Sequence, residues 1–219
     1  MVSASPVRPN PVARSGRRRW DEHVSTFLTT ARLTLREFTA ADAPLLTALD
    51  GDPDVMRYLT GGRPTPAAEI RDRVLPRMLA AYRRPPGWGW WAAERRHDGM
   101  FLGWFEFRPT TDGDAREVEL GYRLRRAAWG AGYATEGARA LVDKGFAELD
   151  VARIVATTMA VNRGSRRVME KAGLAYVRTF HQDWPKAIEG AEHGEVEYAL
   201  TRREWRDGRP SASPSPAGR

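Results

Sequence analysis

Hydrophobic and polar residues follow two different periods along this chain, and the period changes several times. Short segments alternate apolar and polar positions, which is typical of strands that bury one face. Residues 32–38, Arg-Leu-Thr-Leu-Arg-Glu-Phe, are the clearest example near the start. Asp98-Gly99 separates two further segments and predicts a hairpin turn. Strands are expected over residues 32–38, 87–94, 101–108, 117–124, 153–158, 174–180 and 195–201.

Longer segments place apolar residues three or four positions apart and predict helices. Thr39 followed by Asp42 is typical of a capped helix start. Pro76 is expected to kink or divide the helix that contains it. The expected helices span residues 39–49, 53–59, 66–83, 132–148 and 162–172. This order of elements predicts an α/β fold, with a mixed sheet and helices on both of its faces.

The two ends of the chain differ in composition from its middle. Residues 1–19 contain five arginines and no acidic residue, and residues 209–219 are rich in Pro, Ser and Gly. We expect a disordered basic leader (1–19), one folded domain (20–208) and a disordered tail (209–219). The formal charge of +7 belongs to the arginines of the two ends, so the domain itself is near neutral. Nucleic-acid binding by the leader is therefore less expected than a solvated segment.

The composition also excludes several kinds of site. The chain has no cysteine, which rules out disulfides, a cysteine nucleophile and thiolate metal ligands. Its four histidines show no metal-ligand spacing, so no metal is expected. No apolar segment approaches the roughly 20 residues that span a bilayer, and the leader lacks the apolar region of a signal peptide. We expect a cytoplasmic protein with no membrane contact.

Small residues mark the junction between the strand at 117–124 and the helix that follows it. Residues 129–136 read Trp-Gly-Ala-Gly-Tyr-Ala-Thr-Glu. A turn of this kind leaves backbone N–H groups free at a helix start, where a phosphate can approach them. The turn lacks the Lys-Ser/Thr ending of a Walker loop, and Thr135 stands where a dinucleotide fingerprint needs glycine. A helix start packed on a sheet without any ligand remains the alternative.

A second block of residues, after the strand expected at 153–158, narrows the choice of ligand for this turn. Residues 162–174 read Asn-Arg-Gly-Ser-Arg-Arg-Val-Met-Glu-Lys-Ala-Gly-Leu, with Asn162 as a good N-cap. The two blocks together, with Asp-Pro-Asp-Val-Met-Arg-Tyr-Leu at 52–59, resemble the GNAT superfamily of acyl-CoA-dependent N-acyltransferases. The resemblance is greatest to the branch with the ribosomal-protein N-terminal acetyltransferases, and it covers about residues 31–205. It implies a mostly antiparallel, twisted GNAT sheet.

The resemblance also implies an activity. It suggests an enzyme that transfers an acetyl group from acetyl-CoA to a primary amine, by direct attack in a ternary complex. The amine, a protein N-terminus or a small molecule, stays open, as does a homodimer. Two alternatives remain: another acyl group such as succinyl, or a CoA-binding interaction module without catalysis.

Positions for the cofactor follow from the resemblance. Pantetheine would add to the strand edge at Tyr122 and Leu124, and Asn162 would contact it unless it serves only as an N-cap. Trp129 stands where relatives often have Gln or Arg, so phosphate binding would depend on backbone amides. Arg125, with Arg126 and Arg167, either neutralises phosphates or is ordinary surface charge. The pyrophosphate would meet the amides of Gly130, Ala131, Gly132, Tyr133, Ala134 and Thr135.

Catalytic candidates follow in the same way. Glu119, on the strand that would face the acetyl group, is the first candidate for the base, with Glu106 second. The alternative for Glu119 is a salt-bridged strand residue. Ser165 is a candidate to hydrogen-bond the leaving sulfur, because Met169 stands where many relatives have a tyrosine and a thioether cannot donate a proton. A water in place of Ser165, or a leaving group that needs no protonation, are the alternatives. The tryptophans of the hairpin are expected in the core rather than in an acceptor pocket; they are Trp88, Trp90, Trp91 and Trp104.

Overall fold

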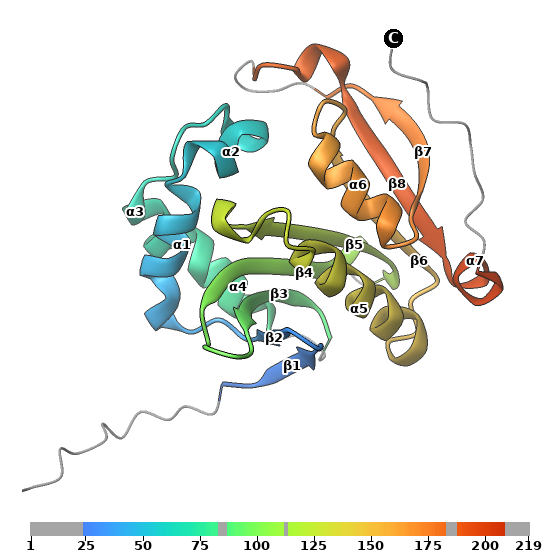
Figure 1. The fold of residues 1–219 in the computed structure, drawn as a ribbon, viewed down its shortest axis with the longest axis horizontal. Coiled ribbons are helices and arrows are strands. Elements are labelled where there is room, and N and C mark those ends of the chain that lie inside the picture. Colours follow the sequence, from blue (N-terminus) through green and yellow to red (C-terminus); the bar gives the residue numbers. More distant parts are fainter. Residues whose placement is uncertain (1–23, 83–86, 112–113, 183–187, 209–219) are drawn as a thin grey trace, which may run out of the picture.

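One eight-stranded sheet organises the chain (Figure 1). The computed structural model describes residues 24–82, 87–111, 114–182 and 188–208. The expected leader and tail lie outside these residues, so the domain limits stay predictions. The strands are β1 (Thr26–Thr29), β2 (Leu33–Arg36), β3 (Gly89–Arg95), β4 (Phe101–Thr111), β5 (Asp114–Leu124), β6 (Arg153–Met159), β7 (Ala175–Phe180) and β8 (Glu195–Thr201).

The strand order is β1-β2-β3-β4-β5-β6-β8-β7. Every neighbouring pair is antiparallel except β5 and β6, which are parallel. The expected mixed, mostly antiparallel sheet is therefore confirmed. A parallel pair needs a crossover connection, and here that connection carries the small-residue turn and the helix after it.

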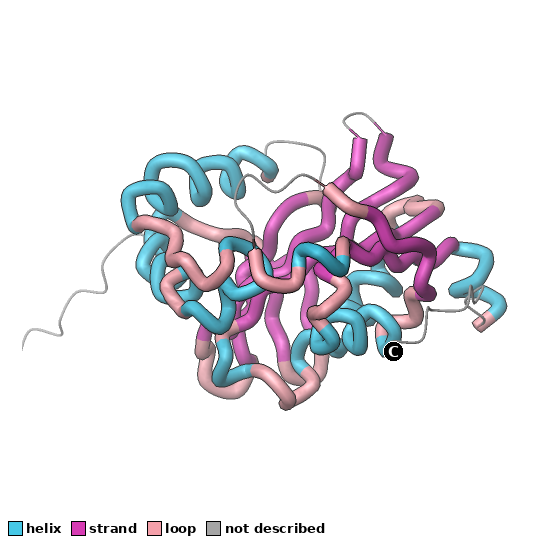
Figure 2. The backbone as a smooth tube through the Cα atoms, turned by 90° about the horizontal axis from the view of Figure 1, so that it is seen from above, coloured by secondary structure: helices cyan, strands magenta, loops and turns pink. Residues whose placement is uncertain are grey.

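Helices lie on either side of this sheet (Figure 2). The α-helices are α1 (Ala43–Asp50), α2 (Pro53–Thr60), α3 (Ala67–Glu69), α4 (Leu75–Ala81), α5 (Tyr133–Glu148), α6 (Arg163–Lys171) and α7 (Arg202–Asp207). Short 3-10 turns cover Ala40–Asp42, Arg126–Ala128 and Ala191–His193, and a π-helical segment covers Ile70–Val74.

Two hydrophobic cores follow from the alternation along β4. Phe105 and Phe107 belong to the core that contains Leu141 of α5, whereas Trp104 belongs to the core that contains Leu46 of α1. Successive side chains of a strand point to opposite faces, so α5 and α6 cover one face and α1 to α4 the other. The expected helices on both faces are confirmed.

Glycine lets α5 approach the sheet closely. A Cβ atom on Gly137 would lie 2.3 Å from the ring of Phe105, and one on Gly145 would lie 2.6 Å from the ring of Phe107. The helix therefore begins in a place fixed by packing, after the turn that follows β5. This packing holds the start of α5 against the sheet end.

The predicted elements differ from the structure in a few places. The helix expected over 66–83 is divided, because Pro76 has no N–H to donate and the π-helical segment precedes it. The four-residue edge strand β1 and the six-residue α7 were not predicted. Thr201 and Glu204 form a capping box at the start of α7, a signal that was readable in the sequence.

The two parallel strands separate along their length. Residues 117–119 of β5 pair with residues 153–155 of β6. Beyond these residues β5 continues to Leu124, while β6 continues to Met159 in register with β8. The edge of β5 that faces β6 is therefore free of strand partners over residues 120–124, next to the turn that starts α5.

Candidate active site

The turn after β5 presents a row of free backbone donors. Gly130 and Gly132 have φ angles of 72° and 83°, in the left-handed region that favours glycine. Within the described part of the chain, none of the backbone N–H groups of residues 130–135 donates a hydrogen bond. They lie at the positive end of the α5 dipole. This arrangement is suited to an anion.

Arg32, which the sequence analysis missed, holds this turn from the side. Its Nη1 donates to the carbonyl oxygen of Ala131 at 2.9 Å, and its Nε donates to Glu136 at 2.6 Å. Its guanidinium also lies 4.5 Å from the ring centroid of Tyr133. Burial alone would raise the pKa of Glu136, but hydrogen bonds from Thr30 and Arg32 lower it below its ordinary value. Glu136 is thus an ionised anchor for the first turn of α5.

A cavity of about 600 Å³ lies beside the turn. Gly132 and Thr135 line it together with the basic side chains of Arg32, Arg139 and Lys171. The donors of the turn and these cations face the same part of the surface. Glu136 and Asp143 also line the cavity, so its side chains carry a net charge of +1, which together with the donors of the turn suits an anion.

Trp129 does not reach toward the turn's donors. Its side chain is about half exposed, at 49% of the residue's surface. Its indole Nε1 donates to the carbonyl oxygen of Leu124, the last residue of β5, at 2.8 Å. The side chain therefore ties the turn back to the strand end, and any anion at the turn meets backbone N–H groups.

The arginines expected near the phosphates differ in their surroundings. Arg125 donates to the carbonyl oxygen of Phe101 at 3.3 Å, and Arg126 forms an ion pair with Asp54 of α2. Arg167, on α6, has no ion pair within the described residues. Arg125 and Arg126 thus have structural partners, which agrees with the alternative of ordinary surface charge.

Asn162 caps α6. Its Oδ1 accepts a hydrogen bond from the backbone N–H of Ser165 at 3.2 Å, and its Nδ2 donates to Thr158 Oγ1 at 3.1 Å. The N-cap role is confirmed, and the cap fixes the first turn of α6 against the end of β6. A contact between Asn162 and pantetheine remains a prediction.

Tyr122 joins β5 to this first turn of α6. Its hydroxyl donates to the carbonyl oxygen of Ser165 at 2.9 Å and lies 3.0 Å from Ser165 Oγ. Burial raises the pKa of Tyr122 well above its usual range, although the contact with Ser165 acts in the opposite direction. The phenol is therefore protonated at neutral pH. Sequence reasoning placed both residues near the cofactor but did not foresee this pair.

Glu119 lies on the opposite face of β5, in a cluster with Glu106 and Arg108 of β4. Arg108 Nη2 is 3.2 Å from a carboxylate oxygen of Glu119, and Arg108 Nε contacts Glu106 more closely. Burial, and then the charge of Glu106, raise the pKa of Glu119, while Arg108 acts in the opposite direction. Glu119 is therefore ion-paired, as the salt-bridge alternative expects, and its pKa is raised; its role as the base stays a prediction.

The tryptophans near this cluster belong to the core. Trp90, Trp91 and Trp104 are at most 8% exposed, and Trp88 is partly buried, with its ring centroid 5.8 Å from that of Phe107. The Arg108 guanidinium lies 5.0 Å from the ring centroid of Trp90. The expectation of a core role is confirmed for the three buried rings.

Among the residues that the structure describes, no group of three or more His, Asp or Glu side chains could hold a metal ion. No helix within the same residues is long and apolar enough to cross a membrane.

Comparison with protein families supplies the deciding observation. The family model described as an acetyltransferase (GNAT) domain matches residues 32–175. This chain belongs to the GNAT acetyltransferase family. It is an enzyme that transfers an acetyl group from acetyl-CoA to an amine nitrogen.

Individual GNAT relatives agree with this assignment. The FsC-acetyl coenzyme A-N(2)-transacetylase of Aspergillus fumigatus is 36% identical over 184 residues, which cover 81% of this chain and 77% of the relative. An acetyltransferase structure from Agrobacterium tumefaciens is 26% identical, with a TM-score of 0.63 over 84% of this chain and 99% of that one. RimL, a ribosomal L7/L12 α-N-protein acetyltransferase solved with coenzyme A, has a TM-score of 0.68 at 18% identity, covering 81% and 98%.

Met169 stands at the position for which the family resemblance implies a tyrosine in many relatives. It is 2% exposed and packs in the core beside α5. Ser165 and Tyr122 therefore provide the hydroxyl groups at the start of α6.

Proposed function

We propose that acetyl-CoA binds along the free edge of β5, with its pyrophosphate on the amides of residues 130–135. The observation that carries this proposal is the separation of β5 from β6 after residue 119. The strand edge that it leaves free runs from the turn to Tyr122 and Ser165. Pantetheine amides can pair with an unpartnered strand edge. The basic cavity beside the turn has room for the remaining phosphate end of the cofactor.

This pose puts the thioester at the free edge of β5, where groups from both faces of the strand can reach it. Glu119 lies on the face covered by α1 to α4, and Ser165, in the first turn of α6, lies at the other face beside Tyr122. The amine attacks the thioester carbonyl carbon, and a C–N bond forms. Glu119 takes a proton from the amine, directly or through one water. A free backbone N–H of residues 120–124 polarises the carbonyl oxygen.

The C–S bond then breaks, and the departing thiolate takes the hydroxyl proton of Ser165. A serine hydroxyl rotates freely, so it can turn from the Tyr122 oxygen to the sulfur. Tyr122, protonated at neutral pH, holds the Ser165 backbone in place through its 2.9 Å hydrogen bond. Solvent returns the proton to Ser165 after the thiol leaves.

The acceptor is a primary amine, and we infer that it approaches from the side of α1 to α4, toward Glu119. The relatives and structural neighbours include an N(2)-transacetylase, an α-N-protein acetyltransferase and a spermidine N-acetyltransferase. The most similar of the three, at 36% identity, favours a small-molecule amine as the first acceptor to test. A cytoplasmic location and a homodimer stay predictions for localisation and light-scattering experiments.

Turnover across an amine panel tests the proposal. Free thiol released from acetyl-CoA should appear with at least one primary amine, and succinyl-CoA should be poorer. Thermal stabilisation by acetyl-CoA without turnover of any amine, peptide N-terminus or acyl donor would support a CoA-binding module instead. Gly132→Glu serves as the binding-deficient control and Glu119→Gln as the catalysis-deficient one.

A further inference from the structure

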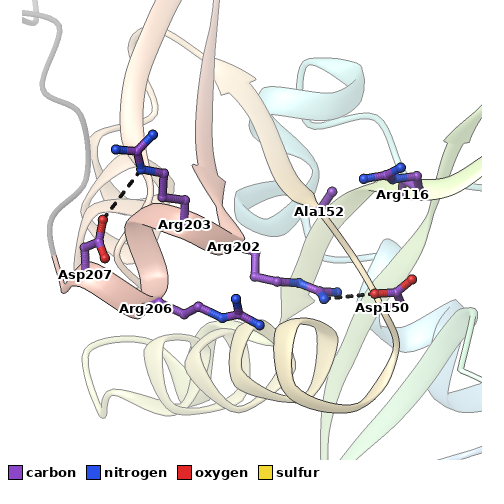
Figure 3. Close-up of a pocket in the computed structure, with 7 residues that line it drawn as sticks. All are labelled: Arg116, Asp150, Ala152, Arg202, Arg203, Arg206 and Asp207. Atoms are coloured by element: carbon purple, nitrogen blue, oxygen red, sulfur yellow. Dashed lines mark ion pairs between the residues drawn. The ribbon is translucent and has the colours of Figure 1, made fainter.

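A second cavity lies at the end of the sheet remote from the small-residue turn (Figure 3). Its volume is about 450 Å³, within the range of small-molecule sites. It is lined by the start of β5, the loop between α5 and β6, and α7; the residues are Arg116, Asp150, Ala152, Arg202, Arg203, Arg206 and Asp207. Four of these seven residues are arginines.

This cavity is separate from the cofactor site. Arg116 lies near the start of β5 and Leu124 is its last residue. Eight residues of extended strand at about 3.3 Å each put roughly 26 Å between them. The cavity therefore cannot serve the pyrophosphate that we place at the turn.

Arg202 forms the floor of the cavity, and its guanidinium is incompletely paired. Its Nη1 is 2.8 Å from Asp150, and its Nε donates to the carbonyl oxygen of Val151 at 2.7 Å. Its Nη2 is enclosed by protein and has no hydrogen-bond partner within the described residues. Nη2 is therefore closed off from the cavity, and the Arg202–Asp150 pair is a fixed part of the cavity wall.

Two further arginines face the same pair. In Figure 3, Arg116 and Arg206 lie on two sides of the Arg202–Asp150 ion pair. Within the described residues, neither guanidinium has an ion pair or hydrogen bond. Asp150, held in the left-handed region at a φ of 54°, is the one carboxylate among these three arginines. The group is left with two uncompensated positive charges.

Arg203 differs from these three. It is exposed and lies 3.8 Å from Asp207, and Figure 3 shows its side chain turned away from the Arg202–Asp150 pair. Arg203 therefore carries the same charge at the same end of the sheet, but its guanidinium does not point toward the Arg202–Asp150 pair. Arg203 is therefore a matched control for the site.

We propose that this cavity binds a dianionic phosphate group carried by a small organic molecule. Guanidinium groups pair with phosphate through two parallel N–H donors, and Arg116 and Arg206 can offer theirs from two sides of the Arg202–Asp150 pair. Two negative charges balance the two uncompensated positive ones. The cavity is larger than a bare phosphate, which leaves room for the organic part of a phosphomonoester.

Calorimetric titration of phenyl phosphate into the full-length protein saturated with CoA tests this site. Saturation with CoA occupies the turn, and constant ionic strength removes diffuse attraction to the basic chain. Saturable binding of one phenyl phosphate at pH 7.5 is expected, and the monoanion benzoate should bind much more weakly. Inorganic phosphate as a second probe separates recognition of the phosphate from that of the ring.

Three single variants locate the binding. Arg116→Gln and Arg206→Gln should each weaken phenyl phosphate about tenfold or more, since each removes a charge-assisted contact. Arg203→Gln, with the same change in net charge, should leave the affinity within about twofold. Absence of saturable binding to the parent protein would overturn the proposal. So would an equal weakening by Arg203→Gln, because that result would indicate only diffuse electrostatic attraction.

Discussion

The two faces of β5 carry different kinds of chemical group. On the face covered by α5 and α6, the site consists of backbone N–H groups at the turn and two hydroxyls, those of Tyr122 and Ser165. On the face covered by α1 to α4, it consists of charged side chains linked by ion pairs, Glu119, Glu106 and Arg108. The face covered by α5 and α6 is suited to hold the cofactor. On the face covered by α1 to α4, neighbouring charges can adjust the pKa of the group that accepts a proton from the amine.

This difference has an electrostatic consequence. Backbone donors keep their partial charges at every pH, so cofactor binding at the turn should depend little on the titration of protein groups. The carboxylates around Arg108 influence one another, because each charge changes the proton affinity of its neighbour. Changes on the α1–α4 side should therefore move the pH dependence of the rate, whereas changes at the turn should move affinity.

Glu119→Gln is expected to have the largest effect. Loss of a general base typically costs about 10²–10⁴ in rate, while CoA affinity, set on the other face, should stay within about twofold of the parent. The deficit should shrink as pH rises and free amine accumulates. Steady-state rates and CoA titrations measure both quantities. Parent rates across the pH range would remove Glu119 from the mechanism and leave Glu106 as the next residue to test.

The same substitution has a predicted sign in stability. Burial raises the pKa of Glu119 in the folded state, so its contribution is fully present below the unfolded-state pKa and is lost as pH rises through the folded-state pKa. Glu119→Gln cannot ionise and does not lose this contribution. Its free energy of unfolding, measured against that of the parent, should therefore increase from acidic to neutral pH. Denaturant unfolding at the two pH values measures this difference.

Gly132→Glu should have the second-largest effect, and it should change the affinity for CoA rather than proton transfer. A Cβ atom at Gly132 would lie 3.4 Å from Arg32 Nη2, and φ there is 83°. Loss of one charge-assisted phosphate contact should weaken CoA roughly 10- to 150-fold. Gly132→Asn, which tolerates the left-handed conformation without adding charge, should lose much less. Equal losses in both variants would attribute the effect to backbone strain.

Sequence reasoning succeeded where the determinants are local. The turn at 129–136, the N-cap at Asn162 and the long strands follow from periodicity, glycine conformation and capping, each of which involves neighbours in the chain. It missed Arg32, which reaches Ala131 from the bend between β1 and β2, and Arg108, which links Glu106 of β4 to Glu119 of β5. These contacts depend on strand order and register, which no local pattern specifies.

Opposite changes of charge beside Glu119 should shift its pKa in opposite directions. Glu106→Gln removes a neighbouring negative charge and should move the acidic limb of the rate profile to lower pH. Arg108→Gln removes the positive charge and should move it to higher pH. Arg77→Gln is the control, because Arg77 also lies over Trp90, at 5.3 Å, without a contact to Glu119. Shifts in the same direction would contradict the assignment of Glu119 as the titrating base.

Tyr122→Phe should have the smallest effect of the series. Phenylalanine keeps the ring packing and removes the hydrogen bond to Ser165, for which about 0.5–1.5 kcal/mol, or roughly 2- to 12-fold in rate, is expected. Ser165→Ala should give a similar modest loss, since a thiolate is a fair leaving group and water can protonate it.

If Tyr122 acts by positioning Ser165, then Tyr122→Phe should change the rate little once Ser165 is alanine, because the group it orients is gone. A double-mutant cycle on kcat measures this coupling, and Glu119→Gln paired with Tyr122→Phe is the matched cycle across the two faces. Additive losses in the Tyr122–Ser165 cycle would mean that the tyrosine supports only the packing of β5 against α6.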